Sequence, residues 1–176
     1  MRTTAHNKVY FIISIATIVI ALLLMTGCSS ARYLLAGLRS TDNFLVSEDD
    51  IRVLFEPGAE EHAKKIVSFL PSAIQQVEER QYSHFIKPVR IYICVSRESF
   101  KKYFGADIRA GEREKVFLSP RAFEGGDEIA KKYLIHELAH LHLRQRIGSY
   151  KMRRLPMWFK EGLATYVSDG AGSNLG

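Results

Sequence analysis

The sequence predicts a single α+β domain, because strand-like runs cluster in its first half and long helical patterns in its second half. The strand-like runs are β-branched and bounded by Pro or Gly, whereas the helical stretches repeat apolar residues every three or four positions. The 176 residues suffice for one domain and a short appendage, with 47% hydrophobic and 25% charged residues, as in an ordinary globular protein. We expect a small, mostly antiparallel sheet packed on two helices.

The first predicted strand is 51–55, a β-branched and apolar run ended by a Pro-Gly pair. An amphipathic helix follows over 59–80, with a bend expected at Pro71 because proline lacks the backbone N–H of a regular turn. The second strand is 88–95, in which apolar and polar residues alternate. Cys94 falls inside this run, which is typical of an inert core cysteine.

Four further elements complete the domain. They are a short helix over 97–104, a strand over 115–119, a long helix over 128–147 and a last helix over 156–168. Ser96 and Gly105 are suited to cap the short helix at its two ends, and Gly148 to stop the long one. A loop over 148–155 would let the last helix fold back against the long helix.

The first 27 residues have the pattern of a secretory signal peptide. A basic start precedes a 17-residue apolar run over 9–25, and Gly27 stands directly before Cys28. This end resembles the lipobox of bacterial lipoproteins, although Met25 occupies a position where leucine is usual. The resemblance implies that Cys28 is lipidated and becomes the first residue of the mature chain. An uncleaved transmembrane anchor is the alternative, since the run is at the short edge for a span.

Either interpretation predicts that residues 29–176 lie outside the cytoplasm, in the cell envelope, on the periplasmic side or the cell surface. We expect residues 28–50 to be a tether, 51–169 to form the domain and 170–176 to be a flexible tail. The only partners predicted are a peptide or protein substrate and the membrane reached through the lipid anchor.

The net charge of +6 comes from Lys and Arg spread along the chain. No basic stripe with interleaved aromatic residues occurs, so we predict no nucleic-acid partner. One cluster stands out, namely Lys151, Arg153 and Arg154. We interpret it as a solvated loop, with contact to an anionic membrane face as the alternative.

The chemistry is expected in the run His136-Glu137-Leu138-Ala139-His140, inside the long predicted helix. Residues four apart lie one turn apart on nearly the same helix face, so the two imidazoles can share one metal ion. Glu137 lies beside them, close enough to act on water without binding the metal. The leucines of this segment fall on the opposite face, spaced for a core: Leu134, Leu138 and Leu141.

A catalytic zinc site needs three protein ligands, so a third ligand must follow downstream. Glu161 is the candidate, 21 residues after His140 in the last predicted helix. Gly162 costs about 1 kcal/mol relative to alanine inside a helix. We therefore expect Gly162 and Ala164 to be small because the two helices approach closely there.

The motif H-E-x-x-H followed by W-F-x-E-G-L-A resembles the gluzincin metallopeptidases, in particular their small peptidase-MA-like members. This resemblance implies a zincin-like fold, Zn²⁺ held by His136, His140 and Glu161, and Glu137 as catalytic base and acid. It also implies that strand 115–119 is the edge strand that receives substrate as an added strand.

Two features depart from the family pattern. Thr165 stands where some gluzincins have an aspartate that orients the first ligand histidine, so the partner of His136 is open. No large C-terminal subdomain follows the last helix to form a far wall. An extra donor to the oxyanion is expected from one of three tyrosines, namely Tyr166, Tyr150 or Tyr133.

The sequence therefore predicts a zinc metallopeptidase anchored at the cell envelope, without indicating its substrate. One alternative is a non-enzymatic envelope lipoprotein that uses the same fold to bind a partner. A second alternative is a structural lipoprotein in which the motif is accidental. Trp158 and Phe159 are interpreted as core anchors, and His142 as a histidine that does not bind the metal because it points away from His140.

Overall fold

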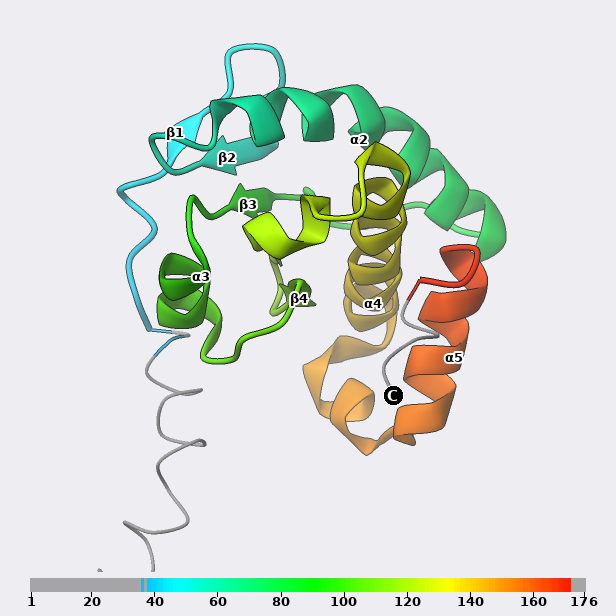
Figure 1. Cartoon of the computed structure of the whole chain (residues 1–176). Helices are drawn as coiled ribbons and strands as arrows, with labels where there is room; N and C mark the ends of the chain where they lie inside the picture. The colour runs from blue at the N-terminus through cyan, green and yellow to red at the C-terminus, as the bar shows by residue number, and fades with distance from the viewer. Residues whose placement is uncertain (1–35, 37, 172–176) are drawn as a thin grey trace, which may run out of the picture.

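The computed structural model describes residue 36 and residues 38–171 (Figure 1). The predicted signal peptide, Cys28 and residues 172–176 lie outside the described residues. Within the described ranges, none of the helices combines the length and hydrophobicity needed to cross a membrane.

A five-stranded sheet in the order β1-β2-β3-β5-β4 organises the domain. The strands are β1 (Leu45–Val46), β2 (Val53–Phe55), β3 (Ile91–Ile93), β4 (Ala110–Glu112) and β5 (Val116–Leu118). Two pairings, β2–β3 and β3–β5, are parallel, and the two outer pairings are antiparallel. The α+β class is confirmed, but the sheet is mixed rather than mostly antiparallel. The reason is that a helix lies between β2 and β3 and between β3 and β5, and such a crossover brings the chain back parallel.

Two strands were missed by the sequence analysis. β1 lies within the segment 28–50 that was expected to be a tether, and it pairs with β2. β4 lies outside β5, so the predicted edge strand at 115–119 is wrong: β5 is internal, and β4 is the strand at that end of the described sheet. The segment Ala-Gly-Glu has low strand propensity, and its pairing with β5 decides its conformation.

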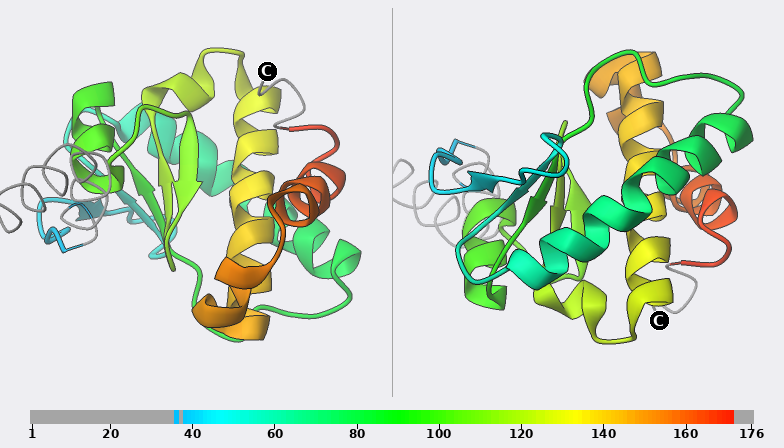
Figure 2. Two further views of the ribbon diagram at one scale, coloured as in Figure 1. Left: turned by 90° about the horizontal axis from the view of Figure 1, so that it is seen from below. Right: turned by 90° about the horizontal axis from the view of Figure 1, so that it is seen from above.

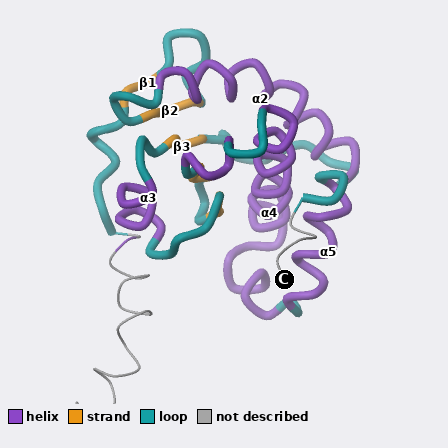
Figure 3. The backbone as a smooth tube through the Cα atoms, in the orientation of Figure 1, coloured by secondary structure: helices purple, strands orange, loops and turns teal. Residues whose placement is uncertain are grey.

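Helices cover both faces of the sheet. They are α2 (Glu60–Arg80), α3 (Arg97–Phe104), α4 (Asp127–Arg154) and α5 (Met157–Val167), with a 3₁₀ turn at Pro120–Phe123. α2 and α4 share one core cluster with one face of the sheet, while α3 packs in a second, aromatic cluster on the other face. Figure 2 shows the sheet between α3 and these longer helices. Figure 3 shows the strands gathered on one side of the molecule, with α4 and α5 on the other.

The predicted helix ends are confirmed at α3. The Ser96 side chain accepts a hydrogen bond from the Ser99 N–H at 3.0 Å, and Gly105 takes a left-handed φ of 87°. Gly148, with φ 80° and ψ 157°, breaks α4 as expected, but the chain resumes a helical course to Arg154 instead of forming a loop over 148–155. Pro71 lies inside α2 without ending it.

The explanation offered for Gly162 is wrong. A Cβ built on Gly162 would meet no atom within 4 Å, because the residue faces solvent. Ala164 instead faces the core, with 1% of its surface exposed. α5 therefore approaches α4 through Ala164, and Gly162 only weakens the helix. A different glycine is sterically required: a Cβ on Gly111 in β4 would overlap the ring of Phe104.

We predict that Gly162→Ala raises the free energy of unfolding by about 0.5–1 kcal/mol, because alanine reduces the freedom of the unfolded helix segment without a clash. Gly111→Ala should lower the free energy of unfolding, because the Phe104 ring must move. Urea denaturation measures the free energy of unfolding of both variants. A destabilised Gly162→Ala protein would show that α5 has a neighbour at this position after all.

Candidate metal centre

The two faces of α4 set the position of the candidate site. Leu134, Leu138 and Leu141 are buried in the main core, as their spacing predicts. His136 and His140 leave the opposite side one turn apart, and their rings meet edge to face with centroids 4.8 Å apart. Because the leucine face of α4 packs in the core, the opposite face directs both imidazoles away from the core.

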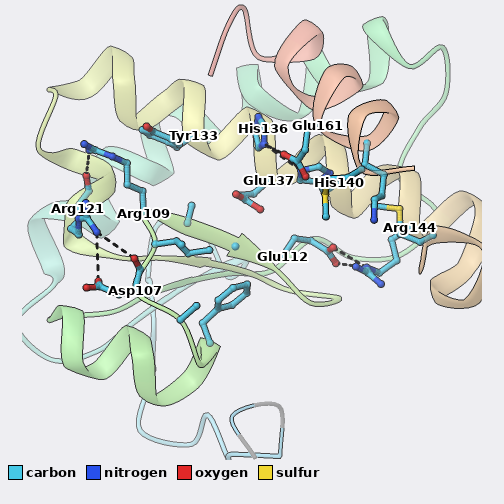
Figure 4. A pocket seen from close by; sticks show the side chains of 18 residues that line it. Asp107, Arg109, Glu112, Arg121, Tyr133, His136, Glu137, His140, Arg144 and Glu161 are labelled. Atoms are coloured by element: carbon cyan, nitrogen blue, oxygen red, sulfur yellow. Dashed lines mark hydrogen bonds and ion pairs between the residues drawn. The ribbon is translucent and has the colours of Figure 1, made fainter. Parts of the chain in front are cut away.

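Glu161 from α5 completes a cluster of three donor atoms (Figure 4). His136 Nε2 lies 3.2 Å from His140 Nε2 and 3.3 Å from Glu161 Oε2, and His140 Nε2 lies 3.5 Å from the same oxygen. Ligands of a tetrahedral zinc ion, each about 2.0–2.1 Å from the metal, are separated by about 3.3 Å. The spacing and the N, N, O donor set therefore fit zinc.

The orientation of His136 is fixed by a residue that the sequence analysis did not identify. His136 Nδ1 lies 3.1 Å from the carbonyl oxygen of Ala171. A carbonyl can only accept, so Nδ1 carries the hydrogen, and in the neutral ring Nε2 presents its lone pair to the cluster. The partner of His136, which the sequence analysis left open, is thus the Ala171 carbonyl among the described residues.

The turn after α5 brings Ala171 to His136. Gly170, with φ 94°, donates its N–H to the Thr165 carbonyl at 2.9 Å, which closes the helix end. Arg80 from α2 donates to Asp169 Oδ1 at 2.7 Å and to the carbonyl of Tyr166 at 2.8 Å. This arginine satisfies carbonyls at the end of α5 and ties the turn to α2.

The ionisable groups of the cluster shift one another's pKa values. Hydrogen bonds with His136 and then His140 hold the pKa of the Glu161 carboxyl well below its usual range. Burial by itself would lower the pKa of His140, but the adjacent carboxylates of Glu161 and Glu137 outweigh it and raise that pKa overall. The Glu161 carboxylate therefore stays ionised, and a cation bound here would take the place of the proton that His140 shares with it.

Glu137 lies beside the cluster without joining it. Burial raises the pKa of its carboxyl to about 7, although the nearby His140 and His136 partly oppose the rise. No group in the described chain hydrogen-bonds this carboxylate, and Figure 4 shows it directed into the pocket. A carboxyl in this setting can exchange protons with water or a ligand in the pocket.

A pocket of about 700 Å³ opens in front of these groups. β4 forms one wall with Ala110–Glu112, α4 forms the opposite wall, and Met157 and Lys160 contribute from α5. The cluster of His136, His140 and Glu161 thus faces a cavity large enough for several residues of a peptide.

One of the three tyrosines predicted as oxyanion donors lines the pocket. Tyr133 lines it, and the Arg109 guanidinium lies 5.5 Å from its ring centroid. Tyr150 and Tyr166 are 62% and 65% exposed and do not belong to the lining. The expectation that Trp158 and Phe159 are core anchors is wrong, since 76% and 39% of their surfaces are exposed at the start of α5.

Sequence reasoning missed the ion pairs formed by two acidic residues of the pocket lining, Glu112 and Asp107. Arg144 Nε donates to both carboxylate oxygens of Glu112, at 2.9 and 2.8 Å, and joins β4 to α4. Arg144 lies four residues after His140, so the helix period could have placed it on the pocket face. Arg97, with help from Lys101, lowers the pKa of Asp107 to about 2.

His142 is buried and does not join the cluster, as predicted. Its Nδ1 lies 2.8 Å from Gln81 Oε1, and its Nε2 lies 2.9 Å from the Ser83 carbonyl. Cys94 is likewise buried in the aromatic core cluster, where burial raises the pKa of its thiol and keeps it unreactive.

No protein-family model, curated protein or solved structure matches this chain in comparisons with known proteins. Functional inference therefore rests on the geometry and chemistry of the site itself.

We predict that a chain ending at Gly170 binds zinc about 10- to 100-fold more weakly, because His136 loses the carbonyl that orients it. Competition with a chromophoric chelator measures the affinity. A chain ending at Gly172 keeps the Ala171 amide carbonyl and serves as the control. Equal affinity in the two shortened chains would mean that Ala171 does not orient the ligand.

Proposed function

We propose that this protein is a zinc-dependent peptidase in which His136, His140 and Glu161 hold the metal and Glu137 acts as base and acid. The observation that carries the proposal is the set of three donor atoms, 3.2 to 3.5 Å apart, facing a pocket. Beside them lies the Glu137 carboxylate, which accepts no hydrogen bond from the described residues. Two neutral nitrogens and one carboxylate oxygen are a ligand set of catalytic zinc, and three protein ligands leave a position open.

A zinc ion held there would supply Lewis acidity that activates water and polarises the scissile carbonyl. The chain's own residues supply the rest. Glu137 takes a proton from the attacking water and passes it to the leaving amine. Ala171 keeps His136 in the tautomer that presents Nε2 to the cluster.

Tyr133 is the tyrosine that the pocket favours as a donor to the developing oxyanion. It lines the cavity, whereas Tyr150 and Tyr166 point to solvent. Its neighbour Arg109 adds positive charge 5.5 Å from the ring centroid. A preorganised donor of this kind is aimed at charge that develops only in the transition state.

The substrate we propose is a peptide in extended conformation. β4 is the last strand of the described sheet at the end where the pocket lies, so its outer edge offers backbone groups to an added strand. The Glu112–Arg144 pair holds this edge against α4. The pocket does not encode a particular sequence, so the proposal specifies the class of substrate only.

The proposed location is the cell envelope, through lipidated Cys28. This part of the proposal depends on the pattern of residues 1–28, with an uncleaved anchor as the alternative. A mass spectrum of the mature chain distinguishes a diacylated or triacylated Cys28 from an intact leader.

Zinc content tests the ligand set. The full-length chain, purified in detergent and supplied with zinc, should retain the metal stoichiometrically, whereas Glu161→Ala should lose it because two histidines alone leave the site incomplete. Elemental analysis after dialysis measures both proteins. Lys160→Ala, the neighbouring residue on α5, is the control and should keep its zinc. A wild-type chain without zinc would rule out the catalytic centre.

Hydrolysis tests the role of Glu137. Glu137→Gln should lower the rate of peptide cleavage by roughly 10²- to 10⁴-fold, because the amide cannot take the proton, while zinc content stays unchanged. A quenched-fluorescence peptide library measures the rate. Undiminished cleavage in the variant would contradict the assignment of the base. A wild-type protein that binds zinc but cleaves nothing would favour the partner-binding lipoprotein instead.

A further inference from the structure

The corner between α4 and α5 carries four exposed large apolar side chains. This α4–α5 corner comprises residues 149–160. Its exposed fractions are 62% for Tyr150, 64% for Met157, 76% for Trp158 and 39% for Phe159. Single exposed apolar residues need no explanation, but four within ten positions of the chain indicate an interaction surface.

The direction of the buried face of α5 explains why Trp158 and Phe159 are exposed. Ala164 and Val167 face the core. At about 100° per residue, Trp158 and Phe159 fall on the other sides of the helix, which face solvent. Met152, with 4% of its surface exposed, anchors the corner from beneath. The exposed side chains are therefore free for a partner outside the described chain.

The charges of the corner are of one sign. Lys151, Arg153 and Arg154 are exposed and Lys160 is half-buried, while no acidic residue occurs between 149 and 160. None of these four cations takes part in an ion pair in the described part of the chain, and Arg154 lies over the Tyr150 ring at 5.0 Å. The nearest acidic contacts are Glu114, whose carboxylate accepts from Ser149 Oγ at 3.4 Å, and Glu161, which faces the two histidines.

We propose that the α4–α5 corner docks onto an anionic lipid membrane. Aromatic side chains with polar edges settle at the boundary between headgroups and acyl chains, and Lys and Arg beside them are attracted to anionic headgroups. A second copy of this chain fits less well, because a symmetric contact would bring two cationic corners together.

Docking would place the pocket close to the lipid surface. Met157 and Lys160 belong both to the corner and to the pocket lining. A polypeptide leaving or lying on the membrane would therefore reach β4 without crossing bulk water. The docking itself does not depend on the proposed peptidase activity, and its test uses no measure of hydrolysis.

Trp158 is the only tryptophan of the chain, so its fluorescence reports on this corner alone. The full-length chain is reconstituted into vesicles of phosphatidylcholine, with and without phosphatidylglycerol. With the anionic lipid we expect Trp158 emission to shift to shorter wavelength and its quenching by acrylamide to fall. Both changes should reverse in 1 M salt, where the Debye length is only about 3 Å.

A charge variant and a matched control complete the experiment. K151S/R153S/R154S should remove the anionic-lipid effect, whereas K64S/K65S/K102S removes three cations from other surfaces and should preserve it. Loss of the effect in both variants, or emission that is equal in the two kinds of vesicle, overturns the proposal. Shielding of Trp158 that depends on protein concentration in detergent, without lipid, would also overturn it in favour of self-association.

Discussion

The packing of the leucine face of α4 against α2 and the sheet is the constraint on which the site depends. Leu134, Leu138 and Leu141 are almost fully buried, and their burial fixes the rotation of the helix about its own axis. Once that rotation is fixed, His136 and His140 face the pocket. Burial of each leucine contributes roughly 1.5–3 kcal/mol, so core packing sets the direction in which the two histidines point.

The spacing of His136, Glu137 and His140 could be read from the sequence because a helix converts spacing into direction with little help from the rest of the fold. Glu161 was predicted differently, from the need for a third ligand downstream and from the resemblance of its segment to the gluzincin motif. The class of fold was also predictable from the order of periodic segments. The strand pairing was not, because β1 has only two residues and β4 reads Ala-Gly-Glu, so that pairing with neighbouring strands defines both.

Residues that act through the backbone or from distant segments escaped sequence reasoning. Ala171 serves through its carbonyl oxygen, which every residue has, so no side chain marks it. Arg80 precedes the turn that it holds by almost ninety positions, and no periodicity links them. The prediction made from Gly162 failed because a small residue indicates close packing of two helices only if it faces the neighbouring helix. Gly162 faces solvent instead.

The closure of α5 onto α2 by Arg80 and Asp169 has a consequence for the whole centre. Glu161 and the carbonyl that orients His136 are both carried by α5 and the turn behind it. A local opening that frees this one short helix would remove one proposed ligand and misalign another in a single step, while α4 and the sheet remain folded. Binding of a metal at the proposed centre would therefore be coupled to the docking of α5.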